Sequence, residues 1–262
     1  MDELSVRTLL KTKAVTLLDV ACRGTCRHRS PEECASATHM VFPYRGVYVR
    51  HVGRSEAVAE ANQVLFFNRG EGYQISHPVA GGDACLSMVV AEPVRAELAP
   101  QKPNELRRRI TTEAQTLLVQ LRHRLVKQLI GELEAESLAL ALARSALGEG
   151  APLGTWGKRK LVERAKLVLA SDLARRWTLS DVASEVGVSP VYLTQVFKQV
   201  EGVPLYRYQL RLRLARALEL LPGADISALS MDLGFSSHSH FTASFRRAYG
   251  RTPVQFLKGM GS

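Results

Sequence analysis

A short helix-turn-helix pattern occurs twice in the last third of the chain, and this repeat constrains the fold more than any other feature. The first copy is LSDVASEVGVSPVYLTQVFKQVEGVP, at 179–204, and the second is ISALSMDLGFSSHSHFTASFRRAYGRTP, at 226–253. Gly187 and Gly234 occupy matching places between two helical segments. Glycine just past a helix end adopts a positive φ without a Cβ clash. Each copy therefore predicts a helix-turn-helix unit.

The second helix of each copy has an apolar inner face and a polar outer face. In the first copy Leu193, Val196 and Phe197 lie at i, i+3 and i+4, which predicts burial on one side. The outer faces are small and polar, with one cation each: Val191, Thr194, Gln195 and Lys198 in the first copy, and His238, Ser239, Thr242, Ala243 and Arg246 in the second. Short hydrogen-bonding side chains suit base edges and a cation suits phosphate, although a solvated αα-hairpin would show a similar face.

The basic charge of the chain is concentrated in the same region. The net charge is +10, and residues 158–262 hold 16 Lys and Arg against 8 Asp and Glu, which places +8 of it there. This imbalance favours a polyanion such as DNA as the partner of the C-terminal part. The segment 205–221 predicts a helix about 25 Å long. Neighbouring major grooves lie about 34 Å apart, so this helix suits two units on one DNA face.

The first part of the chain has a different pattern. From 38 to 90, short segments such as GVYVRHV, QVLFF and ACLSMVV alternate with turn residues. Such spacing predicts a sandwich or small barrel, which can enclose a ligand. The expected fold class is therefore α+β, with an N-terminal β-barrel and a helical segment followed by an all-α domain. The expected boundaries are 1–103 for the β domain, 104–148 for the helical segment, 149–157 for a linker and 158–262 for the DNA-binding domain.

The segment 112–147 predicts two helices interrupted at Gly131. Thr112 with Gln115 fits a capping box at the start of the first helix. A leucine stripe follows along one face: Leu118, Leu121, Leu125 and Leu129. The stripe is compatible with internal packing and with a homodimer interface through 112–147.

The start of the chain is too charged for a signal peptide, and no apolar run reaches about 18 residues. We therefore expect a cytoplasmic protein that does not enter a membrane, with its four cysteines reduced.

From Leu179 to Phe256 the chain resembles the DNA-binding domain of AraC/XylS-type transcription regulators. The motifs LSDVASEVGVSPVYLTQVFK, RLRLARALELL and DLGFSSHSHFTASFRRAYGRTPVQF carry this resemblance. The β-rich part is similar to the cupin-like sensor domains of that family. The resemblance implies a regulator that binds asymmetric promoter sites. It also implies base-reading positions at Val191, Thr194, Gln195, His238, Ser239 and Thr242, and backbone contacts are expected at Ser189, Lys198, Ser237 and Arg246.

The chain also departs from the family pattern. Ala243 stands where a long polar or basic side chain is frequent, so the second helix is expected to read fewer bases or to rely more on DNA shape. Ser244 replaces an inward apolar residue, and QFLKG replaces the usual ending.

The motif CRGTCRHRSPEEC supplies the main alternative. Cys22, Cys26, His28 and Cys34 offer soft metal ligands or a reactive thiol, which would make the protein a metal- or redox-responsive regulator. Their spacing matches no structural zinc module, and the cysteines also fit the role of small apolar residues. An alkylation-response protein of the Ada type shares the C-x3-C motif, but the second cysteine pair of such a site is absent.

A metal-dependent enzyme is a further alternative, because barrels of this kind hold metals through closely spaced histidines. His39, His51 and His77 are scattered, so we expect no enzymatic activity and no cofactor. We expect a small-molecule effector, with His51, Tyr73 and His77 as candidate contacts. The expected partners are double-stranded promoter DNA, this effector and, for an activator, RNA polymerase.

Overall fold

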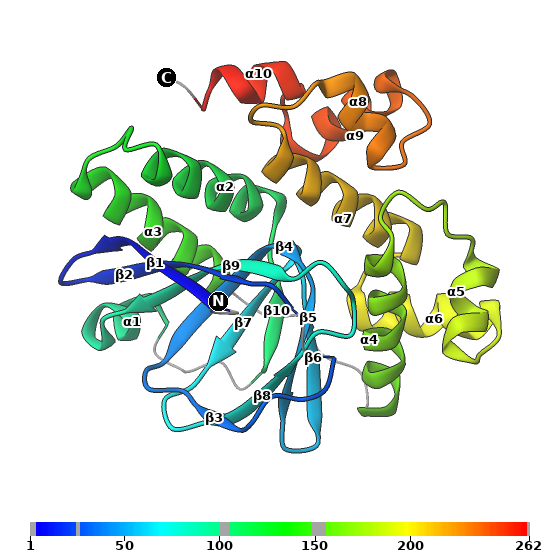
Figure 1. Cartoon of the computed structure of the whole chain (residues 1–262), viewed down its shortest axis with the longest axis horizontal. Helices are drawn as coiled ribbons and strands as arrows, with labels where there is room; N and C mark the ends of the chain where they lie inside the picture. Colours follow the sequence, from blue (N-terminus) through cyan, green and yellow to red (C-terminus); the bar gives the residue numbers. More distant parts are fainter. Residues whose placement is uncertain (1–3, 25–26, 100–104, 148–155, 261–262) are drawn as a thin grey trace.

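The strands of the N-terminal part form two antiparallel sheets. Figure 1 shows the computed structural model, which describes residues 4–24, 27–99, 105–147 and 156–260. The strands are β1 (Leu4–Lys11), β2 (Val15–Cys22), β3 (Glu33–Cys34), β4 (His39–Gly46), β5 (Tyr48–Val52), β6 (Ser55–Ala59), β7 (Gln63–Phe67), β8 (Gly72–Ser76), β9 (Asp83–Val90) and β10 (Arg107–Arg109). One sheet has the order β1-β2-β9-β4-β7-β10 and the other has the order β3-β8-β5-β6. The predicted N-terminal β domain is confirmed.

The central strands of the six-stranded sheet are buried on both faces, and β7 shows this in its continuous apolar sequence. Successive side chains of a strand point to opposite faces. Val64 and Phe66 belong to the core between this sheet and the helices that cover it. Leu65 and Phe67 belong to the core between the two sheets. QVLFF therefore has no solvent-facing position.

The β1–β2 hairpin was not predicted from the sequence. β1 is the edge strand of its sheet and most of its residues are exposed. Its charged residues, Arg7 and Lys11, interrupt the apolar pattern by which strands are recognised. The hairpin therefore extends the β domain to the beginning of the described chain, which places Cys22 at the end of a sheet strand.

Three helices accompany the β domain: α1 (Glu92–Leu98), α2 (Thr112–Val126) and α3 (Glu132–Leu147). In Figure 1, α2 and α3 lie together over one face of the six-stranded sheet. Leu118 and Leu121 of the predicted stripe are buried there, and Leu125 packs against the same core. Leu129 is half exposed because α2 ends at Val126. The stripe thus serves internal packing, and a homodimer through 112–147 stays a prediction.

The predicted capping box of α2 is wrong. The cap is Thr111, whose hydroxyl accepts a hydrogen bond from the backbone N–H of Ala114. Because the helix begins one residue earlier than expected, Ala114 occupies the position that a capping box needs for Glu or Gln. Gln115 is buried instead, and its side-chain nitrogen donates to Oδ1 of Asn62 at 2.6 Å.

The C-terminal part is entirely helical within the described residues. Its helices are α4 (Trp156–Ser171), α5 (Leu179–Val186), α6 (Pro190–Glu201), α7 (Leu205–Leu220), α8 (Ile226–Asp232), α9 (His238–Tyr249) and α10 (Pro253–Lys258). The predicted linker 149–157 lies almost wholly outside the described residues, and α4 begins within its last two positions. None of the helices in the described ranges has the length and apolar character needed to cross a membrane.

The predicted connecting helix is α7, and it takes part in two separate cores. Tyr208 and Leu212 pack with α4, α5 and α6. Leu214 and Leu218 pack with α8, α9 and α10. Since its two halves face different partners, α7 is apolar on more than one side, and it forms a rigid link between the two helix-turn-helix units.

A buried network of charges joins the β domain to the first of these units. Arg107 of β10 forms ion pairs with Glu163 of α4 and with Oε1 of Glu201 of α6, the latter at 2.9 Å. Lys166 of α4 lies 2.7 Å from the same oxygen of Glu201. All four side chains are buried.

Neighbouring hydrogen bonds extend this network across the interface. The backbone N–H of Val58 donates to Oε2 of Glu163 at 2.6 Å. The Tyr208 hydroxyl donates to Oε1 of Glu60 at 2.5 Å. Burial raises the pKa of Glu60, which Lys166 partly offsets. We call these residues the interdomain network: Val58, Glu60, Arg107, Glu163, Lys166, Glu201 and Tyr208.

We expect Glu201→Gln to lower the free energy of unfolding by about 3–5 kcal/mol, because the two buried cations, Arg107 and Lys166, would then share Glu163 as their one carboxylate in the network's ion pairs. Glu134→Gln breaks the pair between Arg124 and the half-exposed Glu134, and should cost at most about 1 kcal/mol. Urea unfolding of both full-length variants provides the comparison. Equal effects would contradict a stabilising role for the network.

The Glu201→Gln variant also tests how the free energy of unfolding depends on pH. Burial alone would raise the pKa of Glu201, but Lys166 and Arg107 outweigh it and lower this pKa to about 2. A lowered carboxyl pKa stabilises the fold above its ordinary value of about 4.3, and the contribution is lost as the pH falls toward 2. The stability difference between wild type and Glu201→Gln should therefore shrink over that range.

Candidate nucleic-acid interface

The first helix-turn-helix unit has the predicted corner. The turn glycine, Gly187, is left-handed with φ of 72°. Ser189 then caps α6, its hydroxyl accepting a hydrogen bond from the backbone N–H of Tyr192. Pro190 occupies the first helical position, where its missing N–H leaves no donor unsatisfied. This sequence of caps ends one helix and starts the next within a few residues.

The second unit repeats the corner with tighter packing. Gly234 has φ of 73°, and a Cβ at this position would lie 2.2 Å from the carbonyl oxygen of Ala174. No other residue fits there without displacing the chain between α4 and α5. Ser237 caps α9 by accepting a hydrogen bond from the backbone N–H of His240. The predicted internal repeat is thus confirmed in its backbone geometry.

The inner faces of α6 and α9 anchor both helices. Leu193, Val196 and Phe197 are buried, as predicted, and Phe197 makes an edge-on contact with Tyr208 of α7. Phe241 and Phe245 are fully buried in the second unit. Ser244 is also buried, as its place on the inner face implied.

The predicted base-reading residues lie on the opposite faces of these helices. In α6 the three side chains are exposed, and Val191 is 69% exposed. A valine this exposed is suited to apolar contact with a thymine methyl group. In α9, Thr242 is half-buried and its hydroxyl lies 3.3 Å from Nε2 of His238. The two predicted sets are Val191, Thr194 and Gln195 in α6, and His238, Ser239 and Thr242 in α9.

The predicted backbone contacts flank these faces. Lys198 and Arg246 are exposed on the same sides as the base-reading residues, one turn further along. Ser189 and Ser237 stand at the two helix N-termini, where free N–H groups and the helix dipole favour phosphate.

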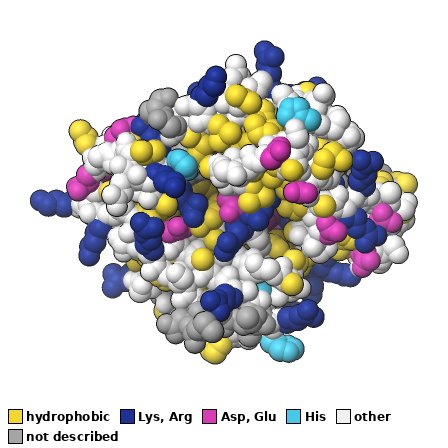
Figure 2. Space-filling view, turned by 45° about the horizontal axis from the view of Figure 1, so that its top comes forward, with side chains coloured by type: hydrophobic (Ala, Val, Ile, Leu, Met, Phe, Trp, Pro, Cys, Tyr) yellow, Lys and Arg dark blue, Asp and Glu magenta, His cyan; other side chains and the backbone are white. Residues whose placement is uncertain are grey.

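The structure adds two residues that the sequence reasoning missed. Arg247 and Thr252 line a shallow hollow beside α9 together with His238, Ala243 and Arg246. The adjacent arginines in FRRAYGRTP were the available signal. On the face shown in Figure 2, Lys and Arg side chains are scattered among acidic ones and do not gather in one patch.

Both recognition helices contact the N-terminal part at their C-terminal ends. Glu201, the last residue of α6, belongs to the interdomain network. Tyr249, the last residue of α9, donates its hydroxyl hydrogen to Oε1 of Gln115 of α2 at 3.2 Å. The N-terminal turns, which hold the predicted base-reading residues, are left exposed.

A cavity of about 750 Å³ lies between the β domain and helices α4 and α7. Arg45 and Glu60 line it from the β domain, and Leu212 and Arg216 line it from α7. Burial and the nearby charge of Arg45 lower the pKa of Arg216. Nε of Arg45 is buried and has no hydrogen-bond partner. Two cations therefore approach each other across this interface.

The predicted effector residues do not line that cavity. Nε2 of His51 lies 2.8 Å from the Ser76 hydroxyl, and burial lowers the pKa of His51. Tyr73 donates its hydroxyl hydrogen to Glu33, and burial raises the pKa of Tyr73 to about 12. His77 lies 2.7 Å from Oδ1 of Asp83. A role for His51, Tyr73 and His77 in effector binding stays a prediction.

Among the described residues, Cys22, His28 and Cys34 do not form the ligand group that the sequence suggested. His28 and Cys34 are exposed, and Cys26 lies outside the described residues. Among the described members of the motif, only Cys22 joins a group of three ligand atoms, and its partners are His77 and Asp83.

Comparison with known proteins assigns the helical part. The family described as "Helix-turn-helix domain" matches residues 182–259. The regulator ExsA of Pseudomonas aeruginosa is 35% identical over 100 residues, which are 37% of this chain and 36% of ExsA. The regulatory protein PocR of Salmonella typhimurium is 35% identical over 97 residues, 36% of this chain and 32% of PocR. The matches thus span about a third of the length of these curated relatives.

Solved structures give two kinds of likeness. An AraC-type regulator from Chromobacterium violaceum is 29% identical, covers 41% of this chain and 98% of its own, and has a TM-score of 0.39. ToxT from Vibrio cholerae is 11% identical, covers 95% of this chain and 98% of its own, and has a TM-score of 0.41.

The two faces of α6 should respond differently to substitution. We expect Gln195→Ala to leave stability unchanged and to weaken binding to a selected DNA site by about 1–3 kcal/mol. Lys198→Ala should weaken specific and non-specific binding alike and reduce the salt slope by about one charge. Phe197→Ala should destabilise the fold by about 3–5 kcal/mol. Urea unfolding and DNA mobility shifts measure the two effects, and wild-type binding by both outer-face variants would show that this face is only solvated.

Proposed function

The C-terminal domain of this chain belongs to the AraC-type helix-turn-helix family, and we propose that the whole protein is a sequence-specific transcription regulator controlled by a small molecule. The observation that carries this proposal is the pair of helix-turn-helix units with buried inner faces and exposed polar outer faces. Two such faces on one chain, linked by α7, are suited to a duplex site with two unlike halves.

The contacts between the domains support control of DNA binding by the N-terminal part. Each recognition helix meets that part at its last residue, α6 through Glu201 and α9 through Tyr249. These two contacts fix both helices relative to the β domain. A change at the interface would therefore alter the orientation of the two outer faces relative to the β domain.

The cavity beside the interdomain network supports an anionic effector. Arg45 of β4 and Arg216 of α7 line it from opposite sides, and Arg216 is also paired with Glu219 of its own helix. Burial and the charge of Arg45 still lower the pKa of Arg216, so a further negative charge between the two arginines would stabilise their charged forms. A carboxylate in this position would contact both domains at once. We therefore propose an effector site between the domains, and effector binding at His51, Tyr73 or His77 stays a separate prediction.

Regulation without catalysis is part of the same proposal. His39 stacks on Phe67 and His51 lies beside the Ser76 hydroxyl, so these two histidines do not join the group that His77 forms with Cys22 and Asp83. An enzyme of this shape would need such groups to converge on a substrate.

We expect the full chain to select an asymmetric duplex from a random DNA pool, with two conserved elements about 10–11 base pairs apart. Binding should weaken steeply with salt because Lys and Arg displace condensed counterions. A matched selection with Gln195→Ala should relax one element only, and Ser239→Ala should relax the other. Failure of the wild type to enrich any sequence would refute specific DNA binding.

We expect at least one small carboxylate to raise the melting temperature of the full chain, while its neutral amide analogue does not. Arg45→Gln and Arg216→Gln should abolish this shift, whereas Arg54→Gln, at an exposed turn of the β domain, should retain it. A panel of carboxylates and matched amides in a thermal-shift assay provides the test. An equal shift in wild type and Arg45→Gln would place the ligand elsewhere.

A further inference from the structure

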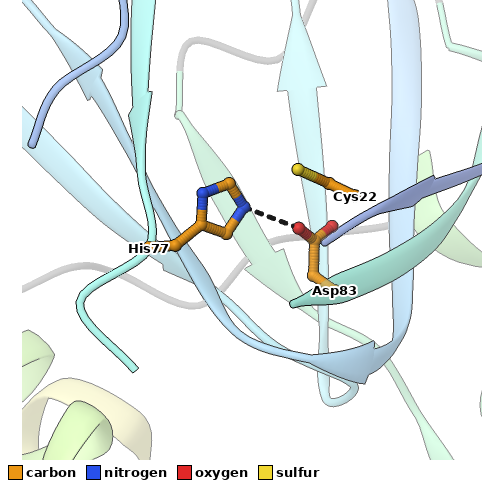
Figure 3. A group of neighbouring side chains, drawn as sticks. All are labelled: Cys22, His77 and Asp83. Atoms are coloured by element: carbon orange, nitrogen blue, oxygen red, sulfur yellow. Dashed lines mark hydrogen bonds and ion pairs between the residues drawn. The ribbon is translucent and has the colours of Figure 1, made fainter. Parts of the chain in front are cut away.

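Three side chains with different metal-binding atoms meet at one end of the β domain. Cys22, His77 and Asp83 each have a ligand atom within 4.8 Å of the other two, and in the described part of the chain no other trio of His, Cys, Asp or Glu does so. Figure 3 shows the three side chains converging. His77 and Asp83 are both more than nine-tenths buried, and Cys22 is half-buried.

The fold brings these residues together from three strands. Cys22 ends β2 and Asp83 begins β9, and the two are direct neighbours across the antiparallel pair. His77 follows the last residue of β8 in the opposite sheet. The group therefore bridges the two sheets at the point where they meet.

The backbone beside the three side chains requires glycine at position 82. Gly82 has φ of 67°, and a Cβ there would lie 2.3 Å from the carbonyl oxygen of Cys22. Only glycine allows the turn before β9 to approach the end of β2 this closely. This close approach holds Cys22 and Asp83 in position before any ligand binds.

The geometry distinguishes a metal site from a nucleophilic relay. In a Cys-His-Asp relay the thiol and the carboxylate bind opposite nitrogens of the imidazole. Here Nε2 of His77 lies 2.7 Å from Oδ1 of Asp83, and Figure 3 shows the sulfur of Cys22 on that same side of the ring. Three ligand atoms on one side of the ring can surround an ion, but they cannot pass a proton in series.

We propose that Cys22, His77 and Asp83 bind one Zn²⁺ ion. A mixed set of sulfur, nitrogen and oxygen ligands suits zinc, which accepts all three in tetrahedral sites. Zinc bonds of about 2.0–2.3 Å separate neighbouring ligand atoms by about 3.3–3.6 Å. The ligand atoms of the group lie within 4.8 Å of one another, so small side-chain rotations would reach this spacing, with the 2.7 Å contact between His77 and Asp83 widening to admit the ion.

Three protein ligands leave the fourth position of the ion open, as in catalytic and exchangeable zinc sites. Cys22 and Gly82 also line the cavity between the domains. A water molecule, or an anionic group that enters the cavity, can complete the coordination. The zinc site stands independently of the proposed DNA-binding function, because its residues lie in the β domain.

The test is zinc binding by the chelator-treated full-length protein. After addition of one equivalent of Zn²⁺ and desalting, we expect about one zinc per chain by elemental analysis in wild type, and loss of this zinc in Cys22→Ser, His77→Gln and Asp83→Asn. Cys34→Ser is the matched control, since Cys34 is exposed and outside the group. With Co²⁺ instead, the thiolate-to-cobalt absorption band should appear in wild type and Cys34→Ser only.

Folding of each variant is checked by far-UV circular dichroism in the presence of chelator. Asp83→Asn retains a side chain of the same size and so preserves the packing. This variant therefore tests metal coordination and not packing. Stoichiometric zinc in folded Cys22→Ser, or no zinc in wild type, would overturn the proposal. The first result would exclude Cys22 as a ligand, and the second would leave His77 and Asp83 as only a hydrogen-bonded pair.

Discussion

The interdomain network is the interaction on which the arrangement of this protein depends. Arg107, Lys166, Glu163 and Glu201 place opposite charges within direct contact in a region without solvent. Removing one partner from such a group is strongly destabilising, because the remaining charge cannot be solvated. The β domain and the first helix-turn-helix unit are therefore joined by contacts that tolerate little rearrangement, with α4 and α6 as the attached elements.

This attachment has consequences for the second unit, since α7 belongs to both helical cores. Its first half packs with α6 and its second half packs with α9. A rotation of α7 relative to the β domain would also displace the contact between Tyr249 and Gln115. The two recognition helices thus have two fixed points on the N-terminal part and one rigid link between them. A ligand can change DNA affinity through this set only if the helices have two arrangements that differ in their affinity for DNA. The ligand must then bind one of these arrangements more tightly than the other.

The helical domain could be predicted from the sequence almost completely, because its signals are local. Gly187, Ser189 and Pro190 determine a corner through their own backbone preferences, and the repeat at Gly234 confirms the interpretation. The interdomain network could not be predicted in this way. Glu163 and Arg107 are 56 positions apart, and a glutamate on a charged helix such as LVERAKLVLAS resembles an ordinary surface residue. The zinc candidate shows the same limit, since sequence spacing grouped Cys22 with its neighbours while the fold placed it beside His77 and Asp83.

The cavity between the domains shares its rim with the group around Cys22. Gly46, which lines the cavity, is so close to the turn before β9 that a Cβ would lie 2.8 Å from Cα of Asp83. Arg45, the proposed anion contact, is the residue before it. An ion held by Asp83 and an anion held by Arg45 would therefore bind to neighbouring segments of the backbone. If the bound ion changes the affinity for the anion by a given factor, the bound anion must change the affinity for the ion by the same factor. The β domain would then report two chemical signals through one interface, because Cys22 and Arg45 both line the cavity that α4 and α7 close from the other side.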